Sequence, residues 1–243
     1  SIEQLYGPPR LPIKGDLLLL NDIKFYRRSC RLSVENWRAL TQLAQTARVT
    51  KTGLLLTIFS QVLARWCSHP AFTLNLTLFN RPMGYPNAES VIGDFTAVSL
   101  LNIHYDSQHS YAQNAQIIQS QLWDDLEHRR YSGVRVNEAL IRSGRFQSPM
   151  PVVFTSVLDH PDGELSAQAV EGFTLLDDVN ITQTPQVWLD HQVLEANGEL
   201  HFNWDVVDAL FEPAIIDAMF ECYCQTLTEL ANQPQRWQMP ESS

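Results

Sequence analysis

The chain has 243 residues, of which 44% are hydrophobic and 18% are charged, and this composition excludes a disordered tail or a collagen-like rod. Lys and Arg number 17 against 27 Asp and Glu, so the formal net charge is −10. Proteins that bind nucleic acid or anionic membrane surfaces generally carry basic patches, and we therefore expect neither kind of partner.

The hydrophobic pattern predicts alternating strands and helices, which is typical of an α/β fold with one compact core. The first 23 residues are rich in proline and are expected to be extended. The tail from residue 232 is expected to fray. The predicted elements, in chain order, are a strand at 24–32, a helix capped by Ser33, a buried helix at 52–67, strands at 71–80 and 93–105, a helix from Ser110 to about 130, a helix at 132–144, a strand at 151–158, a hairpin of 186–195 with 199–205 around Asn197-Gly198, and a helix beginning at Pro213.

The absence of a recognisable targeting segment and the spacing of the cysteines indicate a cytoplasmic chain. No apolar run approaches the roughly 20 residues that span a bilayer, and the first residues lack the basic-then-apolar pattern of a secretory leader. They look instead like the interior of a longer chain. The cysteines are too few and too irregular for a disulfide scaffold or a zinc site, so we expect free thiols and no bound metal: Cys30, Cys67, Cys222 and Cys224.

Motifs of the common nucleotide-binding, hydrolase and zinc-protease machineries are absent from the sequence. Two polar features of predicted strands stand out instead. The first is the pair Thr155 and Ser156, which interrupts the otherwise apolar strand PVVFTSVL. A structural interpretation remains open for this pair, because threonine is a good strand former and its hydroxyl can bond a neighbouring strand.

The second feature is the segment TQTPQVWLDHQV. Strand alternation places Gln186, Trp188, Asp190 and Gln192 on one face and turns His191 to the other, so we do not assign His191 as a base. A two-residue turn at Asn197-Gly198 would pair Asp190 with Asp205 across the hairpin. Directly opposed carboxylates destabilise a sheet unless they are solvated or one holds a proton, and both interpretations remain open.

Taken in order, the segments LLLTIFSQVLARW, FTLNLTLFNR, GDFTAVSLL, PVVFTSVL, TQTPQVWLDHQ and FNWDVVDALF resemble the C-terminal half of heterocyclization domains of nonribosomal peptide synthetases. The combination of PVVFTS with QTPQVWLD is specific, since ordinary condensation domains do not carry both. The resemblance implies a chloramphenicol-acetyltransferase-like α/β lobe over residues 24–231, with a mixed sheet flanked by helices. Residues 1–23 would then lead in from an N-terminal lobe, and 232–243 would form the frayed tail.

The resemblance also implies an activity. Such domains join a carrier-bound acyl or aminoacyl thioester to the amine of carrier-bound Cys, Ser or Thr, and then cyclodehydrate the product to a thiazoline or oxazoline. The expected partners are upstream and downstream carrier proteins, which bring 4′-phosphopantetheine arms, and no cofactor would belong to the domain itself. The glutamine-rich character suggests a yersiniabactin-type siderophore synthetase.

The residues that match the family's motif are Asp190 and Thr155, and the resemblance implies that they are catalytic. One positioned carboxyl can take a proton from the attacking group and deliver one to the departing hydroxyl. Trp204 and Asp205 match a family pair to which we assign a structural role. Lesser roles are expected at the tunnel wall for Ser156, Gln183, Trp188, Asp94, Phe95 and Thr96, and at a bridge between lobes for Arg81.

One departure from the family is that its D-x-x-x-x-D motif appears nowhere in the 243 residues. The chain therefore resembles one lobe, which we expect to be inactive alone and to expose an apolar face that would allow two copies to pair. Two alternatives remain open: a domain that condenses without cyclising, and a module that only docks carrier proteins. The choice of Cys over Ser or Thr depends on pocket shape, which the sequence does not reveal.

Overall fold

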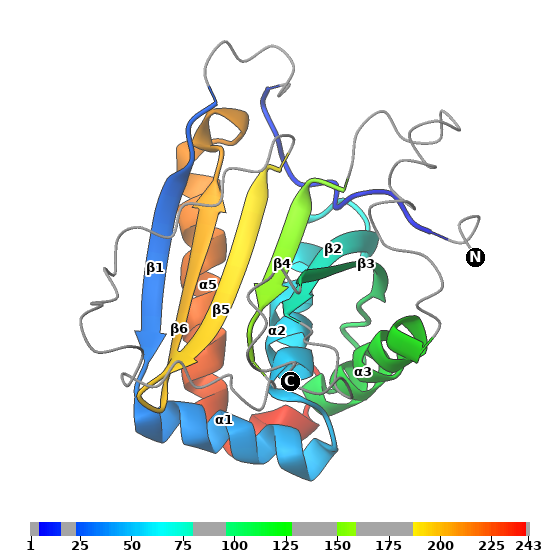
Figure 1. Ribbon diagram of the computed structural model, residues 1–243, viewed down its shortest axis with the longest axis vertical. Coiled ribbons are helices and arrows are strands. Elements are labelled where there is room, and N and C mark those ends of the chain that lie inside the picture. Colours follow the sequence, from blue (N-terminus) through cyan, green and yellow to red (C-terminus); the bar gives the residue numbers. More distant parts are fainter. Residues whose placement is uncertain (1–4, 16–22, 80–95, 128–149, 159–186, 242–243) are drawn as a thin grey trace, which may run out of the picture.

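The computed structural model describes residues 5–15, 23–79, 96–127, 150–158 and 187–241. The predicted helix at 132–144 lies outside these ranges. Figure 1 shows the elements, which in chain order are β1 (Tyr26–Leu32), α1 (Val34–Ala47), α2 (Lys51–Trp66), β2 (Ala71–Phe79), β3 (Thr96–His104), α3 (Tyr111–Glu127), β4 (Val152–Ser156), β5 (Leu189–Ala196), β6 (Glu199–Val206), the 3-10 helix η4 (Asp208–Leu210), α5 (Pro213–Asn232) and the 3-10 helix η5 (Pro234–Gln238).

The strands form one mixed sheet in the order β1-β6-β5-β4-β2-β3. The pairs β1–β6, β5–β6 and β2–β3 are antiparallel, whereas β4 runs parallel to both β2 and β5. Helices α2 and α5 run behind the sheet in Figure 1, and α1 crosses its lower end. The predicted α/β class with a mixed sheet flanked by helices is confirmed.

The hairpin of β5 and β6 has the predicted two-residue turn. Asn197 and Gly198 adopt positive φ angles of 53° and 76°, which the tight turns of β-hairpins require and which Asn and Gly tolerate best. The turn fixes the register, so that Ala196 pairs with Glu199 and Asp190 pairs with Asp205. The predicted opposition of two carboxyls is therefore present in the structure.

Side-chain hydrogen bonds cap the N-termini of α1 and α3. The Ser33 hydroxyl accepts the backbone N–H of Asn36 at the start of α1. At α3, Ser110 and Gln113 form a reciprocal capping box, in which each side chain accepts the other residue's backbone N–H, at 3.2 and 2.9 Å. Pro213 occupies the first turn of α5, as predicted. A backbone N–H at this position would have no intrahelical acceptor, so proline loses no hydrogen bond there.

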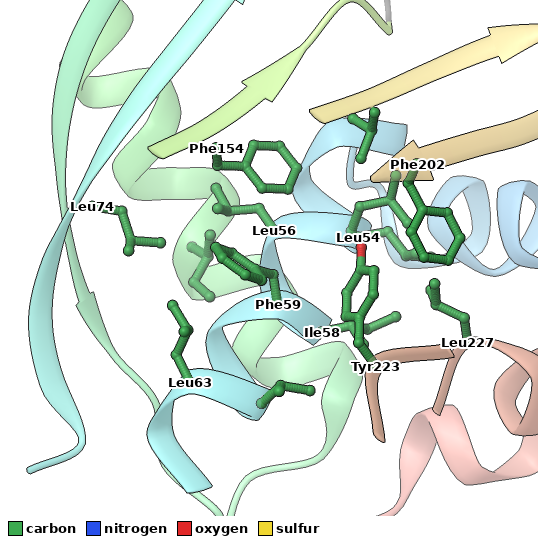
Figure 2. Packing of buried hydrophobic residues seen from close by; sticks show 14 of the residues in the cluster. Leu54, Leu56, Ile58, Phe59, Leu63, Leu74, Phe154, Phe202, Tyr223 and Leu227 are labelled. Atoms are coloured by element: carbon green, nitrogen blue, oxygen red, sulfur yellow. The ribbon is translucent and has the colours of Figure 1, made fainter. Parts of the chain in front are cut away.

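The hydrophobic core lies between the sheet and the helices. Helix α2 is buried on nearly every side, as its wide apolar face predicts, and its Phe59 sits at the centre. Figure 2 shows Phe59 among side chains from the sheet and from α5, including Phe154, Phe202 and Tyr223. The ring centroids of Phe59 and Phe154 are 5.8 Å apart, and those of Phe202 and Tyr223 are 5.3 Å apart in an edge-to-face arrangement.

The described C-terminal residues, 233–241, contact the helices, whereas the sequence analysis expects this tail to fray. Trp237 in η5 is 1% exposed, and its ring stacks on that of Tyr111 at the start of α3. Pro240 forms an isolated bridge with Ser110, and Glu241 forms an ion pair with Arg65 of α2. The prediction failed because polar residues surround this single tryptophan, and its burial depends on a distant partner.

The described N-terminal residues, 5–15, contain no helix and cross from β2 to η4. The Gly7 carbonyl accepts the N–H of Thr73 at 2.8 Å, and the Lys14 N–H bonds the Leu210 carbonyl at 2.8 Å. The four cysteines are free thiols. Within the described ranges, none of the helices combines the length and the apolar character that a bilayer crossing requires.

Candidate functional site

Polar side chains form two rows across the face of the sheet that points away from the helices. Strand register places Arg27 of β1, Asp205 of β6 and Asp190 of β5 side by side in the first row. The second row, two residues along each strand, contains Asn203 of β6, Gln192 of β5 and Thr155 of β4. Side chains two apart on a strand share a face, so the two rows together form one polar surface.

Both carboxyl oxygens of Asp190 have a protein partner. The Thr155 hydroxyl donates to Oδ1 at 3.1 Å, and the Gln192 amide donates from Nε2 to Oδ2 at 2.8 Å. The parallel pairing of β4 with β5 creates the first contact, because Val153 is opposite Asp190 and Thr155 is opposite Gln192. The structure thus brings together the two residues that the sequence analysis assigns as catalytic.

Burial makes the Asp190 carboxyl unusually basic. Its side chain is buried, and the loss of hydration raises its pKa from 3.8 to about 6, although the hydrogen bonds from Gln192 and Thr155 lower it in part. Asp205 also raises this pKa, by charge repulsion, and Arg27 lowers it slightly. A carboxyl with a pKa near 6 exchanges protons readily at neutral pH, which is the property that general acid–base chemistry needs.

The second carboxyl, Asp205, is held as an ion pair. Arg27 donates to it through two nitrogens, Nε and Nη2, each at 2.7 Å, in the bidentate geometry that suits a guanidinium and a carboxylate. Asp205 is 3% exposed, so the arginine compensates a charge that lies away from water. The two opposed carboxyls therefore differ: one is ion-paired with a cation, and the other is free to exchange a proton.

Several other predicted residues lie elsewhere. Ser156 points to the helix side, where its Oγ is 2.7 Å from the Thr52 hydroxyl of α2, so it does not join the polar rows. Trp188 is half-buried and packs against the main core. Thr96 begins β3, paired with Phe79. The remaining predicted tunnel and bridge residues lie outside the described ranges: Gln183, Asp94, Phe95 and Arg81.

His191 does not reach the polar surface. It is fully buried on the helix side, and its ring lies 4.8 Å from that of Phe59 and 4.9 Å from that of Tyr223. Burial lowers its pKa from 6.5 to about 3, so the imidazole is neutral at physiological pH. The prediction that His191 faces away from Asp190 is confirmed.

The sequence analysis did not select Gln192, Asn203 or Arg27 as site residues. Gln192 shares the face of Asp190, and Asn203 shares that of Asp205, so strand alternation could have found both. Arg27 carried no such signal, because its position depends on the long-range pairing of β1 with β6. No group of three or more His, Cys, Asp or Glu side chains in the described ranges is placed to hold a metal ion.

Replacing Arg27 by methionine is expected to raise the pKa of Asp190 above 6, because Asp205 would then face Asp190 without its counter-charge. The titration can be followed through the Asp190 side-chain carboxyl signal in ¹³C NMR. Arg31→Met is a suitable control, since Arg31 lies exposed on the same strand and pairs with His201. A midpoint that stays at about 6 in Arg27→Met would contradict this electrostatic assignment.

The chain is similar in sequence and in structure to several known proteins. A family model described as the condensation domain matches residues 19–240. Pyochelin synthetase PchF of Pseudomonas aeruginosa is 37% identical over 97% of this chain and 13% of its own length, and phenyloxazoline synthase MbtB of Mycolicibacterium paratuberculosis is 35% identical over 98% and 20%. The EpoB cyclization-docking bidomain of Sorangium cellulosum superimposes with a TM-score of 0.85 at 38% identity, over 98% of this chain and 47% of that one. The chain thus spans less than half of each of these proteins.

Proposed function

We propose that this chain carries the residues that close the heterocycle in a heterocyclization domain of a nonribosomal peptide synthetase. The chain belongs to the condensation-domain family and is part of such a domain. The observation that supports this role is the contact between Thr155 and a buried Asp190 whose pKa is about 6. The complete domain would first join a carrier-bound acyl or aminoacyl thioester to the amine of carrier-bound Cys, Ser or Thr. Both substrates would arrive on 4′-phosphopantetheine arms.

Ring closure requires proton transfers that one carboxyl can perform in sequence. As the side-chain thiol or hydroxyl attacks the new amide carbonyl, the Asp190 carboxylate takes its proton and passes it to the carbonyl oxygen, which becomes a hydroxyl. The carboxylate then takes the N–H proton and delivers it to that hydroxyl, which leaves as water while the C=N bond forms. The two protons of the departing water thus come from the attacking group and from the amide nitrogen.

Thr155 supports these steps from the neighbouring strand. Its hydroxyl can donate to the ionised carboxyl and accept from the protonated one, so its contact with Asp190 persists in both states. Positioned general acid–base groups typically contribute about 10² to 10⁴-fold to a rate. We therefore expect Asp190 to provide the larger share of the rate and Thr155 to orient it.

The test uses the complete domain, with its N-terminal half joined to this chain, supplied with a donor carrier and a cysteine-loaded carrier. Intact mass spectrometry of the product is compared between the parent and Asp190→Ala. We expect the amide from both proteins but the further loss of one water only from the parent. Asp217→Ala is the control, because Asp217 is an exposed carboxylate on α5, and we expect it to cyclise normally.

The alternatives predict other products. Undiminished water loss in Asp190→Ala would reject Asp190 as the ring-closing residue. An amide that never loses water, even from the parent, would indicate a domain that condenses without cyclising. Carrier binding without any amide would indicate a docking module. We also expect the 243-residue chain to be inactive without the other half of the domain.

A further inference from the structure

Gln192 lies beside Asp190 on the same strand face and has a partner on each side. Its Nε2 donates to Asp190 Oδ2 at 2.8 Å, and its Oε1 accepts from Asn203 Nδ2 at 3.5 Å across the β5–β6 pair. The side chain is 8% exposed. These contacts fix the orientation of the amide, with its N–H₂ group toward the carboxyl and its oxygen toward Asn203.

The two oxygens of Asp190 therefore face chemically different partners. The amide nitrogen of Gln192 can only donate, so Oδ2 must act as an acceptor whether or not the carboxyl is protonated. The Thr155 hydroxyl can donate or accept, so Oδ1 is the oxygen that can carry a proton and still keep its hydrogen bond. A proton on Oδ2 would make that oxygen a weaker acceptor and would compete with the Gln192 N–H for its lone pairs, which is unfavourable in a buried site.

We propose that Gln192 is a positioning residue that confines the exchangeable proton of Asp190 to Oδ1, the oxygen that faces Thr155. The inference rests on the proposed function and adds to it the atom through which the carboxyl would exchange protons during ring closure. Gln192 does not exchange protons itself. It acts by holding the carboxyl in one orientation and by stabilising its ionised form.

The charged groups that face Asp190 in the described structure are Asp205 of β6 and, beyond it, Arg27 of β1. The one histidine next to Asp190 in sequence, His191, points into the core on the other side of the sheet. A change at Gln192 leaves both charged groups in place. Movement of the Asp190 titration in an uncharged Gln192 variant can thus be assigned to the lost hydrogen bond.

The first measurement is the ¹³C NMR titration of the Asp190 carboxyl in the 243-residue chain, which does not depend on activity. Gln192→Met removes the donor, and we expect the midpoint to rise from about 6 by about one unit. Gln192→Glu keeps the size of the side chain and guards against misfolding of the first variant. It places a second carboxyl beside Asp190, and we expect two coupled titration steps, the upper one well above 6.

Gln61→Met is the matched control, because Gln61 is also a buried glutamine but lies in α2, where it bonds the Tyr111 hydroxyl. We expect it to leave the Asp190 midpoint unchanged. A midpoint that is also unchanged in Gln192→Met, or a single step at about 6 in Gln192→Glu, would overturn the proposed role of Gln192.

The second measurement is the pH dependence of water loss in the complete domain. Gln192→Met is expected to move the limb that reports ionised Asp190 to higher pH, in step with the NMR midpoint, whereas a purely structural role would lower the rate equally at every pH. If the NMR midpoint moves but Asp190→Asn still closes the ring, the proposed function fails while the hydrogen-bond assignment stands. The two failures are therefore distinguishable.

Discussion

Asp190→Asn is expected to be more stable than the parent chain at pH 8, by about 3 kcal/mol, and nearly equal to it at pH 4. The pKa of Asp190 is raised from 3.8 to about 6 in the folded state, so ionising this carboxyl costs stability as pH rises through 6. Below the unfolded value of 3.8 the group is protonated in both states and the cost disappears. The amide fits the site, since its oxygen can accept from Gln192 and its N–H₂ can donate to Thr155.

Urea unfolding of both proteins at pH 8 and pH 4 provides the measurement. Asp205→Asn is an informative control, because it removes the carboxylate that pairs with Arg27 and is expected to destabilise the chain at pH 8. The two substitutions are chemically identical, yet their effects on the free energy of unfolding at pH 8 should have opposite signs. A destabilised Asp190→Asn at pH 8, or a gain equal at both pH values, is incompatible with a carboxyl held at a raised pKa. Combined with loss of ring closure, the gain would show that stability is given up for catalysis at this position.

His191→Phe is expected to remove a stability loss of about 2 kcal/mol that the parent suffers between pH 7.5 and pH 5. The pKa of His191 is lowered from 6.5 to about 3, so in this pH window the imidazole takes up a proton when the chain unfolds but not while it is folded. Stability is therefore lost as pH falls from 6.5 toward 3. Phenylalanine cannot be protonated, and its ring can keep edge-to-face contacts with Phe59 and Tyr223.

The readout is the difference in unfolding free energy between the two pH values, compared between parent and variant. Asp190 titrates in the same window with the opposite sign, but it is present in both proteins and cancels from the comparison. Phe72→Leu is the control, because it changes another buried ring without altering a titratable group, so the pH dependence should stay as in the parent. Equal pH dependence in parent and His191→Phe would mean that the buried ring is protonated without unfolding.

The part of the site that could be predicted depends on local signals. Asn197-Gly198 dictates a two-residue turn, and counting back along the hairpin places Asp190 opposite Asp205. Alternation then assigns the faces of Gln192 and His191. Each of these inferences needs only neighbouring residues, and each agrees with the structure.

The contact between Asp190 and Thr155 has no local signal. The two residues are 35 apart in sequence, and they meet because β4 enters the sheet parallel to β5, a pairing that no turn motif specifies. The residues alone left a structural interpretation of Thr155 open, and only the resemblance to a family joined it to Asp190. The bidentate contact from Arg27 was missed for the same reason, since β1 reaches β6 from the far end of the chain.

Strand β4 is held from both sides by adjacent hydroxyls. Thr155 bonds Asp190 on the polar face, and the next residue, Ser156, bonds Thr52 of α2 on the opposite face. Backbone pairing with β2 and β5 holds β4 in the sheet, and these two side-chain contacts on opposite faces add to that restraint. The angle at which Thr155 meets the carboxyl is thereby coupled to the seating of a helix on the far side of the sheet. The position proposed for Thr155 beside Asp190 would thus depend partly on a serine on the other face of the sheet.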